Sequence, residues 1–357
     1  MRGTLITKMS VAALVLLGMA EHVQAVEPPD LYTTEVAFDA QRRNARDLAY
    51  QRALGEVLTR MTPEPSMALS LVDSPAAYVL GWRESGRGTL WVSFDGAALT
   101  AGLQAAGVPV WGSDRPLTLA WVGVEYPDGG REILSMSPQP VEADERPEAR
   151  AQRAQLRELI RTSASSAGLP VALPVMDETD SAAVAVSDVW GAFGNVLRPA
   201  SRRYRADSIL IARVSLDASG NGRWRSQWLF SGESQTLAGD PTAMMRRIAA
   251  NMLQRFAARP EESSAVRVSI VGVSDAQSYA ELLRFLQTRS LVDNVRVTSM
   301  RQDELNVTLD ALASRERLSE LLAGEELEAL VAPPPVVGVE SQQPDLYFRW
   351  RLASDSF

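Results

Sequence analysis

The sequence predicts an α/β (α+β) protein made of two or three small units in series, followed by a C-terminal strand. Short β-rich runs alternate with stretches whose apolar residues recur every three or four positions, a pattern typical of alternating strands and helices. Asn221-Gly222 between two apolar runs indicates a tight hairpin. The predicted divisions after residue 25 are an N-terminal unit at 26–116, a middle unit at 117–260, a last unit at 265–331, and a Pro-rich linker with a terminal strand at 332–357.

The first unit is expected to follow the order β-α-β-β-α. Asp39 is a plausible N-cap for the first helix, and apolar residues from Ala45 to Met61 form one stripe. Pro63 follows the stripe and ends that helix, whereas Gly107 closes the second one. The expected elements are a strand at 31–38, a helix between Asp39 and Met61, strands at 78–82 and 89–94, and a helix at 95–106.

The middle unit begins with a continuous apolar strand at 117–124, which predicts a sheet covered on both faces. Residues 127–147 are rich in turn formers and charges, so we expect a loop there. Gly168 and Pro170 mark the end of the next helix. The remaining elements are a helix at 148–167, a strand at 171–176, a helical stretch at 187–203 with a break near Pro199, a hairpin of strands at 208–216 and 223–230, and a helix at 242–258.

The last unit reads β-α-β-β-α-β, the split-βαβ pattern. Its expected elements are strands at 266–273, 292–300, 304–309 and 327–331, with helices at 276–288 and 315–322. Pro333-Pro334-Pro335 indicates a stiff linker. Residues 345–352 then predict a final strand that joins the edge of one of the preceding sheets.

Residues 1–25 have the pattern of an export signal. Arg2 and Lys8 precede a short apolar run at 11–19, and Val23-Gln24-Ala25 fits a cleavage site. No cysteine follows the run, so a lipoprotein signal is not indicated. We expect a periplasmic protein that is not stably inserted in a membrane after cleavage, with an uncleaved inner-membrane anchor as the alternative. The net charge of −8 argues against a nucleic-acid partner and against anionic lipid surfaces.

Three residue types are missing from the chain after residue 25. The only histidine is His22, the only lysine is Lys8, and there is no cysteine at all. Imidazole and thiolate metal sites, nucleophilic triads and lysine chemistry are therefore not available. The sequence predicts a protein that is not an enzyme and has no cofactor.

Carboxylates gather at two places. Asp177, Glu178 and Asp180 follow a predicted strand, where they could act as an acid/base pair or bind Ca²⁺. The spacing matches no EF-hand loop, and the alternative is a solvated loop in which an Asp caps the next helix. The second group, Glu142, Asp144 and Glu145, precedes a helix and suits its dipole.

Eight tryptophans suggest either an interaction surface or core packing. The segment from Trp111 to Pro116 combines Trp, Gly, Arg and Pro, which indicates a fixed elbow between two units. Arg115 could pair with Asp114 or reach the next unit. The candidate interaction residues are Trp111, Arg115, Asp177 and Trp190.

Several short motifs recur in an order that resembles a known family. They include Trp111-Gly112-Ser113-Asp114-Arg115-Pro116, Gly168-Leu169-Pro170, Pro174-Val175-Met176-Asp177, Asp188-Val189-Trp190-Gly191 and Arg203-Tyr204-Arg205-Ala206-Asp207. Together they resemble the uncharacterised proteobacterial exported family called domain-of-unknown-function 2066, over nearly the whole chain after residue 25. The middle unit also looks like the N-terminal α/β domain of the periplasmic protein TolB. These likenesses imply protein–protein interaction in the cell envelope, by analogy of fold.

The function expected from these observations is a non-enzymatic interaction or assembly factor of the envelope, whose partners are envelope proteins of unknown identity. Two alternatives stay open. One is a carboxylate-based hydrolase of cell-wall glycan, with Asp177, Glu178, Asp180 and Trp190 as its first candidates. The other is a Ca²⁺-binding module that uses oxygen ligands only.

Overall fold

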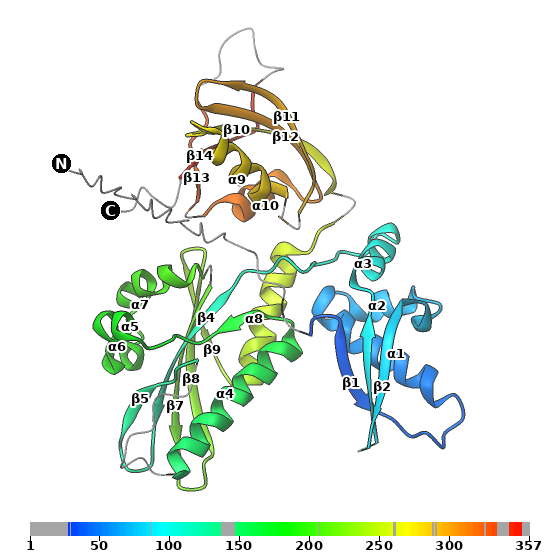
Figure 1. Ribbon diagram of the computed structural model, residues 1–357, viewed down its shortest axis with the longest axis vertical. Coiled ribbons are helices and arrows are strands. Elements are labelled where there is room, and N and C mark those ends of the chain that lie inside the picture. Colours follow the sequence, from blue (N-terminus) through cyan, green and yellow to red (C-terminus); the bar gives the residue numbers. More distant parts are fainter. Residues whose placement is uncertain are drawn as a thin grey trace, which may run out of the picture.

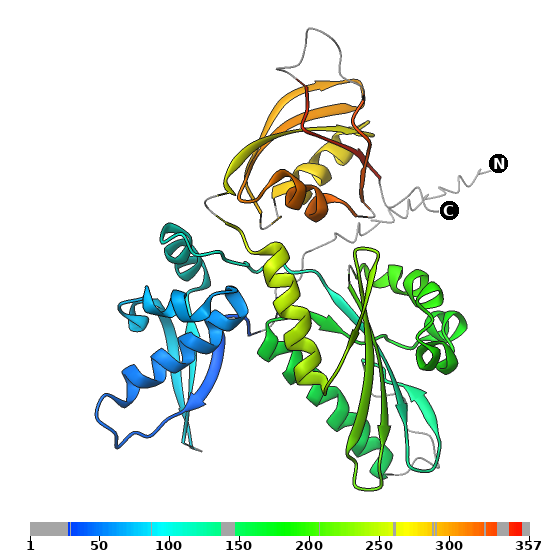
Figure 2. The ribbon, with the colours of Figure 1, turned by 180° about the vertical axis from the view of Figure 1, so that it is seen from behind.

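The computed structural model describes residues 28, 30–86, 88–136, 147–206, 208–259, 262–287, 289, 291–324, 326–333 and 343–351. Their strands form three separate sheets, and each sheet has its own helices and its own hydrophobic core, which confirms the predicted α/β class. In Figures 1 and 2 the middle unit lies beside the first unit and below the third, and α8 points toward the third unit. The predicted export signal and the group Glu142, Asp144 and Glu145 lie outside the described residues.

The first unit is an antiparallel three-stranded sheet packed against helices on one face. The strand order is β1-β3-β2, and α1 covers the apolar face with buried residues such as Leu54 and Leu58. The described elements are β1 (Thr33–Ala37), α1 (Ala45–Met61), α2 (Pro65–Ser70), the 3-10 turn η1 (Pro75–Tyr78), β2 (Val79–Ser85), β3 (Thr89–Phe94) and α3 (Gly96–Ala105). The predicted order β-α-β-β-α is confirmed, with α2 and η1 as additions.

The middle unit is a mixed six-stranded sheet with helices on both faces. Its strand order is β5-β4-β7-β8-β9, and β6 pairs with β4. Helices α4 and α8 cover one face, whereas α5, α6 and α7 cover part of the other (Figure 1). The described elements are β4 (Thr118–Glu125), β5 (Arg131–Ile133), α4 (Pro147–Ala167), β6 (Val171–Ala172), α5 (Glu178–Ala183), α6 (Val186–Gly191), α7 (Gly194–Ser201), η2 (Arg202–Tyr204), β7 (Ser208–Leu216), β8 (Gly222–Phe230), β9 (Glu233–Leu237) and α8 (Pro241–Phe256).

The third unit has the predicted split-βαβ order and one extra strand. Its elements are β10 (Ser264–Val271), α9 (Ala276–Gln287), β11 (Val292–Arg301), β12 (Glu304–Ala311), α10 (Arg315–Leu322), β13 (Leu327–Ala329) and β14 (Leu346–Trp350). The strand order is β11-β12-β10-β14-β13. The terminal strand β14 therefore lies inside the sheet, parallel to β10 and antiparallel to β13, with Phe348 and Trp350 buried. The prediction that it joins a sheet edge was wrong.

Two predicted helix boundaries also differ from the structure. The first helix begins at Ala45 rather than after Asp39, because the Asp39 carboxylate accepts a hydrogen bond from the Gln41 amide in a preceding turn. The stretch at 187–203 breaks at Ala192, which has a φ of 54°, and Pro199 lies inside α7. Among the described helices, none has the length and apolar character needed to cross a membrane.

Candidate functional site

Trp111 and Arg115 lie at the junction between the first and middle units. Trp111 packs in the core of the middle unit, 6.4 Å from the ring of Phe256, and its amide donates to the carbonyl of Met61 at the end of α1. Arg115 lies over the Trp111 ring at 4.0 Å. Its guanidinium donates to Gly168 O at 2.6 Å and to Arg60 O at 2.7 Å, so it connects both units.

A second arginine completes this junction. Arg60, in the last turn of α1, donates to Thr33 O at 2.7 Å and to Ser166 O at 3.3 Å. Ser166 and Gly168 lie at the C-terminal end of α4, where unpaired carbonyls carry partial negative charge. That end of α4 therefore stabilises two guanidinium groups that hydrogen-bond to backbone carbonyls. Burial lowers the pKa of Arg60. It lowers the pKa of Arg115 to about 9, so Arg115 stays charged at neutral pH.

The expectation that Trp111 and Arg115 form an interaction surface is corrected by their burial. Trp111 is fully buried and Arg115 is 1% exposed, so neither side chain can meet a partner protein. Their residue types instead serve the elbow between the units: the indole fills the core of the middle unit, and the planar guanidinium donates to several carbonyls at once. The geometry shows that Arg115 reaches the next unit.

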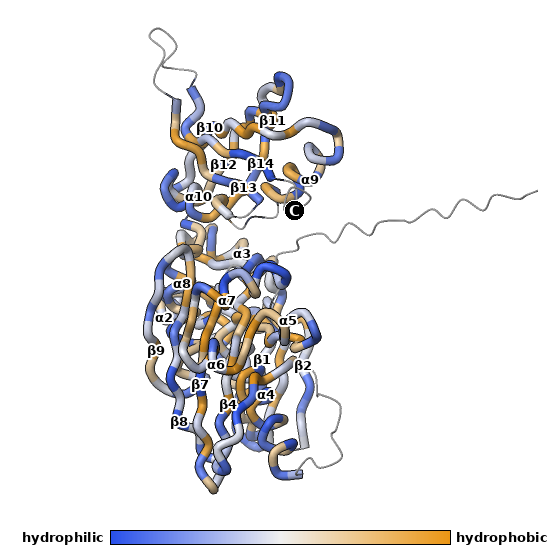
Figure 3. The backbone as a smooth tube through the Cα atoms, turned by 90° about the vertical axis from the view of Figure 1, so that its left-hand side faces the viewer, coloured by the Kyte–Doolittle hydropathy of each residue, from blue (hydrophilic) through white to orange (hydrophobic). Residues whose placement is uncertain are grey.

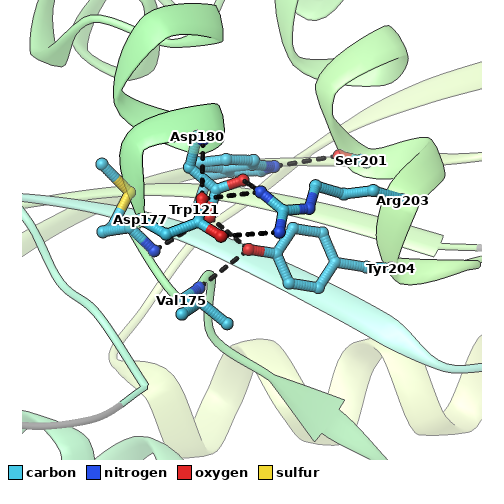
Figure 4. A network of polar contacts seen from close by, with 8 residues as sticks. Trp121, Val175, Asp177, Asp180, Ser201, Arg203 and Tyr204 are labelled. Atoms are coloured by element: carbon cyan, nitrogen blue, oxygen red, sulfur yellow. Dashed lines mark hydrogen bonds and ion pairs between the residues drawn. The ribbon is translucent and has the colours of Figure 1, made fainter.

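Asp177 belongs to a polar network beside α5 (Figure 4). Arg203 binds both oxygens of Asp177 at 2.7 Å and also donates to Asp180 Oδ1 at 2.9 Å. The Tyr204 hydroxyl donates to Asp180 Oδ2, which also accepts from the Met176 amide at 2.8 Å. Asp177 caps α5 through the Asp180 amide. The predicted Asp cap of the next helix is confirmed, but Asp180 is buried rather than solvated, and the network ties the segment before α5 to η2.

The electrostatics of this network do not suit acid/base chemistry. The hydrogen bonds from Arg203 and from the Asp180 amide hold the pKa of Asp177 well below its usual range. A general acid or base works best with a pKa near the operating pH, so Asp177 is tuned in the opposite direction. Burial and the bond to Asp180 raise the pKa of Tyr204 to about 12. Beneath the network, the Trp121 indole donates to Ser201 Oγ at 2.9 Å (Figure 4).

Among the described residues, no cluster of three or more His, Cys, Asp or Glu side chains is arranged to hold a metal ion. Asp177 and Asp180 share the guanidinium of Arg203 instead. Glu178 is exposed in the first turn of α5, where a carboxylate suits the helix dipole.

Trp190 lies in a different setting, on α6, half-buried. Its ring contacts Arg131 at 4.3 Å, and its carbonyl accepts from Arg213. Gly123 of β4 lies beneath the ring, where a Cβ atom would meet the indole at 3.3 Å. The lower ends of β4, β7 and β8 extend beyond α6, as Figures 1 and 3 show. Trp190 therefore borders a part of the sheet face that α5–α7 leave uncovered.

Four arginines lie on this uncovered part of the sheet, which we call the arginine face. They are Arg131 of β5, Arg213 of β7, and Arg223 and Arg225 of β8. Sequence reasoning missed them, because only the strand register brings residues from three strands together. The segment Arg223-Trp224-Arg225 carried a partial signal: alternation places both arginines on one face and Trp224 on the other, against the core.

The edge strand β2 of the first unit is a second exposed feature. It pairs only with β3 among the described strands, and we call its other side, which carries no described strand, the open edge. Leu80 lies at a register shift between Val79 and Gly81 and is 70% exposed, and Trp82 is 42% exposed. Arg46 lies over the Trp82 ring at 4.2 Å.

Comparison with known proteins gives one match. Residues 25–112 match the model of a family described as a domain of unknown function, DUF8605. This match covers the first unit, and the family differs from the one that the sequence motifs resemble. No curated protein and no solved structure matches the chain. The likeness of the middle unit to the TolB-type domain stays a prediction.

Proposed function

We propose that this protein is a non-enzymatic interaction or assembly factor of the bacterial cell envelope, exported to the periplasm by its N-terminal segment. The observation that carries this proposal is the open edge of β2, with Leu80 and Trp82 exposed beside it. An extended segment of a partner protein can add a strand to such an edge through main-chain hydrogen bonds, while apolar side chains supply contact area.

The junction between the first and middle units supports the same proposal. Arg60 and Arg115 hold the first unit to α4 through several carbonyl contacts, so β2 is presented on a rigidly attached unit. A preorganised surface loses less conformational entropy when a partner binds. We keep the proposal non-enzymatic because Asp177, the leading candidate of a hydrolase, is ion-paired with Arg203 and has a lowered pKa.

The test is capture of partners from cross-linked envelope extracts with the tagged full chain and two matched variants. Leu80→Asp places a charge at the open edge, whereas Leu159→Asp places the same charge at an exposed position of α4. We expect a reproducible envelope partner with the native chain and with Leu159→Asp, and its loss with Leu80→Asp. Equal recovery with both variants, or no reproducible partner at all, would overturn the proposal.

A parallel assay addresses the hydrolase directly. Purified sacculi are incubated with the native chain and with Asp177→Asn. We expect no release of muropeptides by either protein. Release by the native chain that disappears in Asp177→Asn would replace this proposal with a carboxylate-based hydrolase.

A further inference from the structure

The arginine face concentrates positive charge on a chain whose net charge is −8. Among its four arginines, only Arg131 pairs with a carboxylate of the described residues, at 2.6 Å from Glu125 Oε1. Arg213 donates to the neutral Trp190 carbonyl, and Arg223 and Arg225 are exposed and have no polar partner in the described part of the structure. Glu125 also accepts a hydrogen bond from Ser215 at 2.8 Å. Within the described residues, Arg213, Arg223 and Arg225 therefore have no carboxylate partner.

The strand register makes this a built arrangement rather than a scatter of surface charges. Arg213 and Arg225 are direct cross-strand partners. Side chains at such positions have Cβ atoms about 5 Å apart, and like charges there are destabilising. Arg223 precedes Arg225 by two residues and lies on the same face, about 7 Å away along the strand. An anionic group between these side chains would remove the repulsion that the isolated protein retains.

The shape of the face indicates the kind of anion. Its side chains project from adjacent strands of one sheet, and a flat array suits an extended acidic segment better than one compact phosphate, which is usually held by converging backbone amides. Carboxylates at alternate positions of an extended peptide repeat every ~7 Å, which matches the spacing of Arg223 and Arg225. Arginine binds carboxylates in a bidentate manner, and Trp190 adds an aromatic side chain at the border.

We propose that the arginine face binds an Asp/Glu-rich segment of a partner protein, in extended conformation along β7 and β8. A membrane surface is the less suitable partner, since it would bring the acidic remainder of the chain against anionic headgroups. This site lies on a different unit from the β2 edge and does not depend on it. Experiments can therefore overturn either proposal without overturning the other.

The test measures binding of a fluorescent oligoglutamate peptide to the full chain by anisotropy at low ionic strength. The variant Arg223→Gln/Arg225→Gln removes two charges of the face. The control Arg246→Gln/Arg247→Gln removes two exposed charges of α8, on the other side of the sheet. We expect the first variant to weaken binding about 10-fold and the control to change it less than about 2-fold. Salt should weaken the native interaction, because the screening length shortens from ~30 Å at 0.01 M to ~8 Å at 0.15 M.

Two further arms separate the remaining outcomes. Arg223→Lys/Arg225→Lys keeps the charge and should bind more tightly than the Gln variant, which excludes a folding defect as the cause. Leu80→Asp should leave peptide binding unchanged. A result against the β2 edge can therefore be told apart from a result against the arginine face. The inference is overturned if the native chain does not bind the peptide, if the Gln variant and the control bind it equally, or if phosphatidylglycerol vesicles bind while the peptide does not.

Discussion

At both junctions of the middle unit, arginine side chains bind the C-terminal end of a helix, but the surroundings of these arginines differ. At the first junction, Arg60 and Arg115 bind carbonyls at the C-terminal end of α4. At the second, Arg317 of α10 binds the carbonyls of Arg255 and Ala257 at the end of α8, at 2.7 and 2.8 Å. Each neighbouring unit thus caps a helix of the middle unit, where a cation suits the helix dipole.

The difference between the junctions lies in burial and in the counter-charge. Arg115 is 1% exposed, and every acceptor found for it is a carbonyl. The side chain of Arg317 is 19% exposed and also pairs with Glu262 at 3.1 Å. A buried guanidinium needs all of its acceptors to offset the loss of hydration, whereas a hydrated ion pair tolerates change. From this difference we expect the first junction to depend more strongly on its arginine than the second, although the capping contacts are similar.

The largest expected effect is that of Arg115→Met. The substitution leaves the carbonyls of Arg60, Trp111 and Gly168 without their buried donor. We expect the free energy of unfolding to fall by about 3–5 kcal/mol, measured by urea denaturation. The matched change Arg317→Met should cost about 1–2 kcal/mol, since the Arg317 side chain is itself 19% exposed and partly hydrated. Equal losses at both positions would break the comparison.

Gly168→Ala tests the same junction from the side of α4. Gly168 has a φ of +67°, and an added Cβ would lie 2.7 Å from Arg115 Nη1 and 2.9 Å from Arg60 Cβ. We expect a loss of about 2 kcal/mol in the free energy of unfolding, from backbone strain and from the displaced guanidinium. Gly107→Ala is the control: its φ is +76°, but nothing lies within 4 Å of the new Cβ, so only the backbone term of about 1 kcal/mol applies. A loss at Gly168 no larger than at Gly107 would show that the guanidinium can move at little cost.

The smallest expected effect is a pH dependence of stability at Asp177. It tests the difference between an arginine bound to a carboxylate, Arg203, and one bound to carbonyls, Arg115. The pKa of Asp177 in the folded chain lies below its ordinary value of 3.8, because Arg203 and the Asp180 amide bind the charged form. Its contribution to stability is present above pH ~4 and is lost as pH falls toward the folded pKa. We expect Asp177→Asn to destabilise the chain at pH 7 and to have a smaller effect at pH ~3. Urea midpoints at the two values measure this.

The effect of Arg115→Met, by contrast, should be the same at both pH values. Its acceptors are carbonyls that do not titrate, and its pKa of about 9 keeps the guanidinium charged at either pH. An Asp177→Asn effect independent of pH, or an Arg115→Met effect that disappears in acid, would contradict the assignment of these partners.

Much of the fold could be predicted from the sequence, because each long helix or strand has a recognisable local pattern of apolar or turn residues. The stripe of α1, the continuous apolar strand β4 and the Asn221-Gly222 hairpin all appeared where expected. The short strands β5 and β9 were missed, since three to five largely polar residues carry no clear alternation. Strand β14 was found, but its place inside the sheet depends on pairing with β10, and sequence position gives no information on that.

The site residues divide in the same way. The segment 111–116 was correctly identified as an elbow, because its residue types restrict the backbone locally. Whether Trp111 and Arg115 are exposed depends on the units packed around them, so that part was wrong. The arginine face needs the register of β4, β5, β7 and β8, and no local pattern fully encodes it.

The position of β14 also has a consequence for the order of folding. Strand β13 pairs only with β14 among the described strands, and the contact between Val268 and Leu346 joins residues 78 positions apart. Closing so long a loop is slow relative to forming the β11–β12 hairpin, whose strands are neighbours in sequence. We therefore expect the third sheet to complete its centre last, after the residues near position 350 have reached it, so that β10 keeps an unpaired edge until then.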